Sequence, residues 1–236
     1  MLSIVIPCYN EGQKLVNNIK KVNEYMDNIG EEYEIIVVND GSKDNTLDIL
    51  TENNHLFKHT KIVTYPINKG KGFAVKTGLL EAVGDYVIFM DADLSTDLSA
   101  IKVVLEKIQI SPVDIIIGNR RGENSKEENK GFIRHLMSWG CHVVTVIFTG
   151  VNFVDTQCGF KALKNNVAKH LASKQKIERF AFDIEYLYIA KLHNYSVIDI
   201  PVIWENDKDS KVRIVRDTIR FFKDIVKIRL NKKYYL

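Results

Sequence analysis

Short runs of apolar, often β-branched residues alternate with amphipathic stretches along the first 120 residues of the chain. The apolar runs predict β-strands at residues 2–7, 34–39, 61–65, 85–90 and 113–118. Apolar positions between these runs recur at helical spacing and predict helices at residues 11–28, 44–52, 71–82 and 98–109. This alternation predicts an α/β fold with a Rossmann-like, mostly parallel sheet and helices on both faces.

The pattern changes after a polar stretch at residues 122–131, which predicts a surface loop. Further helices are predicted near residues 132–149, 165–173 and 181–193, a strand at 196–204, and a final helix in the C-terminal segment. Residues 136–154 carry no Asp, Glu, Lys or Arg, but only 12 of these 19 residues are apolar. This composition favours a core or interfacial helix over a membrane span. No linker divides the chain, so we expect one main domain over residues 1–210 and a C-terminal amphipathic helix at 211–236.

Charge is distributed unevenly along the chain. The 236 residues carry 33 Lys and Arg against 30 Asp and Glu, and a net charge of +3 excludes a dedicated nucleic-acid binder. Residues 211–236, however, hold nine basic residues against two acidic ones. The three cysteines show no CxxC spacing, which argues against a disulfide framework or a zinc ribbon and favours a reducing cytoplasm.

Polar clusters follow four of the predicted strands, at residues 8–12, 39–42, 91–93 and 118–121. Ligands of open α/β sheets bind at the carboxyl ends of the strands, so these clusters predict a site along one sheet edge. A single cluster such as residues 39–42 is equally well explained as a turn with a helix cap. Four clusters at one edge favour a functional site.

Asp91 and Asp93 form the most specific cluster, because both follow the apolar strand at residues 85–90. Hard carboxylate oxygens at a strand end suit Mg²⁺ or Mn²⁺, which completes its coordination with substrate phosphates and water. Residues 68–72 (NKGKG) open a helix with glycines and resemble a backbone cradle for phosphate. The alternative for this segment is a flexible turn with solvated lysines.

Together, the segments PCYNE (residues 7–11), NDGS (39–42), NKGKG (68–72) and DAD (91–93) resemble family 2 glycosyltransferases of the GT-A fold. In the second half, VDTQCGFK (154–161), ERFAFDIE (178–185), WE (204–205) and SK (210–211) resemble the polyprenyl-phosphate hexosyltransferases. Within that group the pattern is most similar to the dolichyl-phosphate β-glucosyltransferases, with the mannosyltransferases next.

The resemblance implies inverting transfer of a hexose, with glucose from UDP-glucose favoured, to a polyprenyl or dolichyl phosphate. We expect a catalytic domain at residues 1–210, attached peripherally to the cytoplasmic face of a membrane, and no nucleic-acid partner. Two alternatives remain: a GDP-mannose-dependent mannosyltransferase, and a membrane-recruited relative without catalysis. A sugar-1-phosphate nucleotidyltransferase is disfavoured, because CYNE at residues 8–11 is not its glycine-rich signature.

The resemblance also implies residue roles. The nucleotide sugar is expected to contact Pro7, Tyr9, Glu11, Asp40, Lys71 and Asp91. The metal, Mg²⁺ or Mn²⁺, is expected on Asp91 and Asp93. The acceptor phosphate is expected to contact Arg120, Arg134, Ser138, Ser210 and Lys211. The residues expected to be catalytic are Asp91, Asp93, Arg120 and Asp183.

The expected mechanism follows from the negative charges of the acceptor phosphate and the leaving diphosphate. A phosphate monoester is mostly a dianion at neutral pH, so this nucleophile hardly needs a general base. The leaving diphosphate needs its developing charge held by the metal, and arginines are needed to bring two anions together. Asp183 and Glu185 are then expected to orient cations or sugar hydroxyls; a buried salt bridge within their helix is the alternative.

The C-terminal helix has two possible locations. Val215, Ile219, Phe222 and Val226 form an apolar stripe beside Phe221, Ile225 and Ile228, with basic residues around it. The stripe either packs on the domain or lies among lipid headgroups. We favour the headgroup location, because a polyprenyl acceptor stays in the bilayer and a basic amphipathic helix binds anionic lipid.

Overall fold

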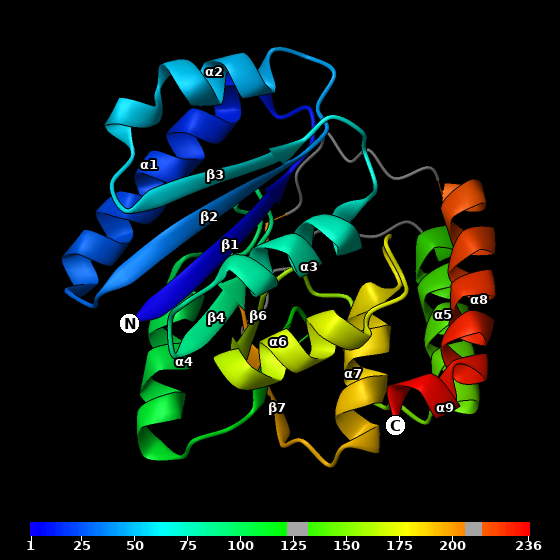
Figure 1. Ribbon diagram of the computed structural model, residues 1–236. Helices are drawn as coiled ribbons and strands as arrows, with labels where there is room; N and C mark the ends of the chain where they lie inside the picture. Colours follow the sequence, from blue (N-terminus) through cyan, green and yellow to red (C-terminus); the bar gives the residue numbers. More distant parts are fainter. Residues whose placement is uncertain (122–131, 206–213) are drawn as a thin grey trace.

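The computed structural model describes the backbone of residues 1–121, 132–205 and 214–236, and the side chains of these except 132–139 and 214–217. The described residues contain a seven-stranded sheet in the order β3-β2-β1-β4-β6-β5-β7 (Figure 1). The strands are β1 (Leu2–Cys8), β2 (Tyr33–Asp40), β3 (Thr60–Tyr65), β4 (Tyr86–Phe89), β5 (Ile115–Asn119), β6 (Lys161–Lys164) and β7 (Val197–Pro201).

Six of these strands run in the same direction, and β6 runs against them between β4 and β5. The carboxyl ends of β1, β2, β4 and β5 therefore lie at one edge of the sheet. Because β6 is reversed, its first residue, Lys161, lies at that edge as well, opposite Phe89 of β4 and Ile117 of β5. The mostly parallel sheet predicted from the sequence is confirmed.

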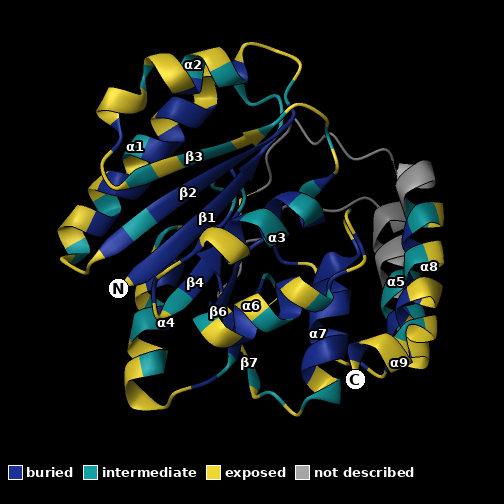
Figure 2. Ribbon diagram, in the orientation of Figure 1, coloured by how far each residue is buried: buried dark blue, intermediate teal, exposed yellow. Residues whose placement is uncertain are grey.

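Alternating strand residues face two separate hydrophobic cores. In β1, Ile4 and Ile6 pack in one core and Val5 packs in the other. The first core lies under α1 (Gly12–Ile29), α2 (Thr46–Glu52) and α4 (Ser99–Ile110). The second lies under α3 (Lys71–Glu81), α6 (Asn165–Lys174), α7 (Phe182–Leu192) and α8 (Ile214–Leu230). The central strands β1, β2, β4 and β5 are thus buried on both faces, as their strongly apolar sequences predict, while the edge strands β3 and β7 are partly exposed (Figure 2).

Three short features differ from the sequence prediction. Strand β6 was not predicted, and neither were the 3₁₀ turn η1 (Asn54–Leu56) and α9 (Lys232–Tyr235). The strand predicted at residues 196–204 ends at Pro201, and Trp204 forms an isolated bridge with Thr96. The helix predicted from residue 44 begins at Thr46, and the Asp44 carboxylate before it accepts a hydrogen bond from the Thr46 amide.

Helix α8 lies beside α5 (Phe132–Thr149) and packs against α7 (Figure 1). Its inner face, formed by Phe221, Ile225 and Ile228, is buried in the second core. On its outer face Ile219, Val226 and Leu230 are exposed, and Lys223 and Lys227 lie beside them. The helix therefore packs on the domain and still presents an apolar, basic surface. The side chains of Val215 and Arg216 lie outside the described residues. Within the described part of the chain, no helix is both long and apolar enough to cross a membrane.

Candidate active site

Asp91 lies two residues beyond β4, at the carboxyl edge of the sheet, and pairs with Lys71. The Lys71 Nζ atom is 2.5 Å from Oδ1 of Asp91, and the side chains are 24% and 34% exposed respectively. Burial lowers the pKa of Lys71, but the attraction of Asp91, Asp183 and Asp93 outweighs it, so the pKa is raised and the ammonium stays charged. The structure thus brings together the first residue of α3 and the first carboxylate of the predicted metal pair.

Gly159 forms the wall behind Asp91. A Cβ atom at this position would lie 1.9 Å from Oδ2 of Asp91, so only glycine leaves room for the carboxylate. Gly159 lies two residues before β6, so the reversed direction of this strand brings Gly159 to the same edge of the sheet as Asp91. The side chain of Asp91 is therefore confined between the Gly159 backbone and the Lys71 ammonium.

Asp91 and Asp93 fit a divalent metal by their chemistry. Asp93 accepts a hydrogen bond from the Ser95 amide on one oxygen, 2.9 Å away. In the described residues, no group of three or more His, Cys, Asp or Glu side chains is arranged to hold a metal by itself. Magnesium characteristically uses one or two carboxylates and takes its remaining oxygens from phosphates and water. The pair therefore fits a metal that binds together with a phosphate-bearing ligand.

Asp40, at the end of β2, organises the loop that leads to Lys71. One of its carboxylate oxygens accepts hydrogen bonds from the Tyr65 hydroxyl and the Lys69 amide, each at 2.8 Å. The other accepts from the Asn68 side chain and the Gly70 amide, also at 2.8 Å. The four hydrogen bonds use the whole acceptor capacity of the carboxylate. Asp40, predicted to contact the nucleotide sugar, is thus seen here shaping the loop beside that site.

Gly41 and Gly70 are required where this loop passes close to other backbone. Both have positive φ, at 58° and 113°. A Cβ atom on Gly41 would lie 2.6 Å from the Asn68 amide nitrogen, and one on Gly70 would lie 2.6 Å from the Glu178 carbonyl oxygen. The glycines of the NDGS and NKGKG segments therefore allow the two segments to pack closely against each other and against the residues that precede α7.

The remaining predicted nucleotide contacts follow β1. Pro7 is buried within the strand, while Tyr9 and Glu11 are half-buried just beyond it. The next segment is tied to β2, because the Asn10 amide donates to the Ser42 hydroxyl and the Lys43 amide donates to the Asn10 side chain. These residues share the sheet edge with Asp40 and Asp91, as the sequence predicts.

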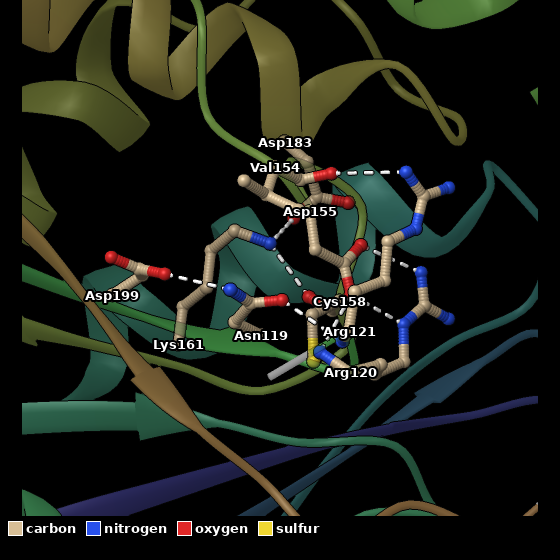
Figure 3. A network of polar contacts seen from close by, with 9 residues as sticks. All are labelled: Asn119, Arg120, Arg121, Val154, Asp155, Cys158, Lys161, Asp183 and Asp199. Carbon is tan, nitrogen blue, oxygen red and sulfur yellow. Dashed lines mark hydrogen bonds and ion pairs between the residues drawn. The ribbon is translucent and has the colours of Figure 1, made fainter. Parts of the chain in front are cut away.

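Arg120 follows β5 and is held by Asp155 (Figure 3). Its Nε and Nη2 atoms donate to the two carboxylate oxygens at 2.7 and 2.8 Å, and its amide donates to the same group at 3.0 Å. Burial opposes both charges, but the hydrogen bonds and mutual attraction outweigh it, so the pKa of Arg120 is raised and that of Asp155 is lowered. The guanidinium also lies over the Trp204 ring, 5.3 Å from its centre.

A pocket opens beside Arg120, between the end of β5, helix α5 and the segment before β6. Its polar lining comprises Arg120, Arg121, His142, Thr145, Thr156 and Gln157, together with Asp155, which pairs with Arg120. Two arginines and several neutral donors make this lining suitable for an anion. Arg134 and Ser138 belong to α5, which contributes to the same pocket, but their side chains lie outside the described residues, as do Ser210 and Lys211.

Asp183, at the start of α7, forms a buried ion pair with Lys161 (Figure 3). The Lys161 Nζ atom lies 2.5 Å from Oδ1 of Asp183 and donates to the Cys158 carbonyl at 2.6 Å. Burial raises the pKa of Asp183 against the attraction of Lys161 and Lys71. The buried salt bridge considered from the sequence is therefore present, but it joins α7 to β6 instead of lying within one helix.

Glu185 lies away from this site and is fully buried. One carboxylate oxygen accepts from the Lys176 amide at 2.8 Å, and the other accepts from the Ile177 amide at 2.9 Å. Its position corrects the expectation that Glu185 orients acceptor-side cations or sugar hydroxyls, since its acceptors are used by backbone in the interior.

Three residues of the site have no role in the sequence prediction: Asp155, Gly159 and Lys161. All three belong to the VDTQCGFK segment, which was recognised as a family signature without individual roles. Gly159 and Lys161 become informative only once β6 is known to run backwards into the site edge. The role of Asp155 can be recognised only once the structure shows that Arg120, 35 residues earlier, lies beside it.

Known proteins resemble this chain in sequence. The model of the family described as Glycosyl transferase family 2 matches residues 3–171. Dolichyl-phosphate beta-glucosyltransferase ALG5C of Trichomonas vaginalis is 34% identical over 97% of this chain and 70% of its own length. The dolichyl-phosphate beta-glucosyltransferase of Saccharomyces cerevisiae is 32% identical over 97% of this chain and 74% of its own length.

Solved structures resemble the fold. Glucosyl-3-phosphoglycerate synthase from Mycobacterium tuberculosis, solved with Mn²⁺, uridine-diphosphate and glucosyl-3-phosphoglycerate, superposes with a TM-score of 0.67 at 16% identity, covering 98% of this chain and 79% of that one. Mannosyl-3-phosphoglycerate synthase from Rubrobacter xylanophilus gives a TM-score of 0.70 at 19% identity, covering 100% of this chain and 75% of that one. The GT-A fold expected from the sequence is confirmed.

Proposed function

The chain belongs to glycosyl transferase family 2, and we propose that it transfers glucose from UDP-glucose to a polyprenyl phosphate with inversion at the anomeric carbon. Relatives named dolichyl-phosphate beta-glucosyltransferase, which align with almost the whole chain, support this reaction. The observation that carries the proposal is the arrangement of Asp91, Asp93 and Lys71 at the carboxyl edge of the sheet, where charge is available for a nucleoside diphosphate.

We assign the binding of the nucleotide-sugar donor to the residues around Asp91, Asp93 and Lys71. Asp91 and Asp93 would hold Mg²⁺ or Mn²⁺, which would supply charge stabilisation for the leaving diphosphate. Lys71 offers a second cation to the same diphosphate. Tyr9 and Glu11 line the nucleotide pocket with Pro7, and Asp40 maintains the pocket through the loop that it binds.

The acceptor side is assigned to the pocket beside Arg120. Asp155 fixes the guanidinium through Nε and Nη2, and Nη1 can still donate to a phosphate oxygen. Arg121 and His142 add positive or donor groups to the lining. Arg134 and Ser138 of α5, together with Ser210 and Lys211, complete the proposed phosphate site. A bound phosphate dianion attacks the anomeric carbon directly, without a protein base.

Asp183 has a positioning role in this proposal. Its carboxylate pairs with Lys161 in the interior, and the phosphate dianion of the acceptor carries no proton that a base must remove. Its charge also attracts Lys71 and so helps keep the ammonium at the site. Asp183 thereby supports the catalytic arrangement through two lysines.

The outer face of α8 supports peripheral attachment to a membrane, which we propose to be at its cytoplasmic face. Ile219, Val226 and Leu230 are exposed there next to Lys223 and Lys227. Such a surface buries apolar side chains at the headgroup boundary and attracts anionic lipid. A polyprenyl phosphate would then meet the enzyme at the bilayer surface.

A transfer assay tests the reaction. The protein is incubated with Mn²⁺ or Mg²⁺, polyprenyl phosphate and radiolabelled UDP-glucose, UDP-N-acetylglucosamine or GDP-mannose, and label is measured in the lipid extract. We expect transfer from UDP-glucose, loss of transfer in EDTA, and loss in Asp93→Asn with the fold retained. Transfer from GDP-mannose alone would identify a mannosyltransferase, and no transfer from any donor would indicate a relative without catalysis.

A further inference from the structure

Lys71 contacts the carboxylate of Asp91, which is also a proposed ligand of the divalent metal. Building on the function proposed above, we infer that Lys71 is an exchangeable counter-ion of Asp91, which a nucleoside diphosphate must draw away before the metal binds tightly. Metal and nucleotide then bind as a coupled pair, and each binds weakly alone.

The first support is the geometry around Asp91. The Lys71 Nζ atom contacts Oδ1 at 2.5 Å, while the Gly159 backbone closes off Oδ2. A cation that approaches Asp91 therefore meets the oxygen that the ammonium already contacts. With the side chains 24% and 34% exposed, the ion pair can be reached by a ligand from solvent.

The second support is the rigidity of the Lys71 backbone. Gly70 and Gly72 flank it, and Cβ atoms on them would lie 2.6 Å and 2.9 Å from carbonyl oxygens of residues 177–179. The Phe73 amide also donates to the Glu178 carbonyl at 3.0 Å. Since the backbone is packed this closely, the movable part is the flexible side chain of Lys71, which can swing from a carboxylate to a phosphate without displacing the helix.

The third support is the balance of charge. Asp91 and Asp93 together with Lys71 leave one net negative charge, and Asp183 is neutralised by Lys161. In the described part of the chain, no third acidic, His or Cys side chain completes a metal cluster. A divalent cation alone therefore finds little negative charge. A diphosphate brings charge and oxygen ligands for the metal, and gives Lys71 a new anion to contact.

The test measures metal binding directly. Free Mn²⁺ is quantified by electron paramagnetic resonance during titration of the purified protein, with and without UDP. For the wild type we expect UDP to tighten Mn²⁺ binding at least about tenfold, which corresponds to a coupling free energy of about 1.4 kcal/mol. In Lys71→Met we expect Mn²⁺ alone to bind about tenfold more tightly than to the wild type, and the effect of UDP to shrink.

Two further variants serve as controls. Lys76 lies on the same helix, and its ammonium is 3.5 Å from the Gln175 carbonyl oxygen instead of at Asp91. Lys76→Met is therefore expected to match the wild type. Lys71→Arg keeps the positive charge and is expected to keep the dependence of Mn²⁺ binding on UDP. This variant shows whether the effect of Lys71→Met comes from the lost charge or from any substitution at this position. Circular dichroism checks that each variant is folded.

The outcomes separate this inference from the proposed function. If the wild type binds Mn²⁺ with UDP but Lys71→Met shows unchanged binding of Mn²⁺ alone, the counter-ion role is overturned and the metal site stands. Equal Mn²⁺ affinity of the wild type with and without UDP overturns it as well. If the wild type fails to bind Mn²⁺ even with UDP, the proposed metal site is overturned together with this inference.

Discussion

The hydroxyl of Tyr235, the penultimate residue of the sequence, donates a hydrogen bond to the buried carboxylate of Glu185, 2.5 Å away. That carboxylate also binds the amides of Lys176 and Ile177, which lead into the segment packed on Gly70 and Gly72. Helix α9 is therefore connected, through the side chains of Tyr235 and Glu185, to the segment that packs on the start of α3, where Lys71 lies.

The hydroxyl of Tyr235 is expected to contribute to stability. Tyr235→Phe removes one donor from a buried carboxylate, and such a hydrogen bond to a charged group contributes about 2 kcal/mol. Urea unfolding followed by circular dichroism measures the change. Tyr234→Phe is the matched control, because Tyr234 is 43% exposed and its ring contacts with Lys174 and Lys176 are kept in the variant. Equal midpoints for the two variants would show that the Glu185 contact contributes nothing.

The small side chain at position 159 is expected to be essential for activity. In Gly159→Ala the new methyl group would overlap Oδ2 of Asp91, so the carboxylate must move. A displacement of about 1 Å at a reacting centre can reduce the rate about 100-fold. Transfer activity and Mn²⁺–UDP binding measure the effect. Gly140→Ala is the control, since a Cβ atom at that position meets nothing within 4 Å and should preserve activity.

His170 is expected to make stability depend on pH. Burial, together with the charges of His193 and Lys174, lowers the pKa of His170 from its ordinary value of 6.5. The unfolded chain therefore takes up a proton near pH 6.5 that the folded chain takes up only at lower pH. The stabilisation is complete above pH 6.5 and is lost as the pH falls through the folded pKa.

Urea midpoints at pH 7.5 and 5.5 check this direction. The wild type should lose more stability between the two pH values than His170→Phe, which cannot be protonated. His55→Phe alters an exposed histidine and should behave like the wild type. A pH dependence that is unchanged in His170→Phe would assign the effect to other groups.

The basic outer face of α8 is expected to bind anionic membranes. Replacing Arg220, Lys223 and Lys227 with Gln removes three charges, each contributing about 1 kcal/mol near an anionic surface. Cosedimentation with phosphatidylserine vesicles should therefore fall by about two orders of magnitude in partition coefficient, and salt should release the wild type. Gln at Lys21, Lys102 and Lys107, on the helices of the opposite sheet face, is the charge-matched control. Equal binding to neutral vesicles would contradict an electrostatic anchor.

Local signals in the sequence were sufficient for the central part of the fold and for Asp91. Strands β2 and β5 can be recognised because they are apolar on both faces, and Asp91 and Asp93 follow the apolar strand β4. Strand β6 escaped prediction because it has four residues and begins with Lys161, whose charge suggests a surface position. Only the tertiary partner Asp183 makes that burial possible.

The local sequence pattern also could not decide between the two possible locations of the C-terminal helix. Phe221 and Val226 both belong to the apolar part of the helix, yet the first is buried and the second is 41% exposed. Periodicity defines the apolar face of a helix but does not say how much of that face the domain covers. The position of α5 and α7 decides which residues remain outside.

The reversed strand β6 has a consequence for the order in which the protein assembles. Strands β1 to β4 pair with one another from the first 89 residues, whereas β5 is joined to them in the sheet only through β6. During synthesis the amino-terminal half can therefore form a partial sheet before residue 161 has left the ribosome. Until then Asp91 has neither the backbone of Gly159 behind it nor the Lys161–Asp183 pair nearby. The nascent chain thus completes its reaction centre late, together with helices α6, α7 and α8 of the second core.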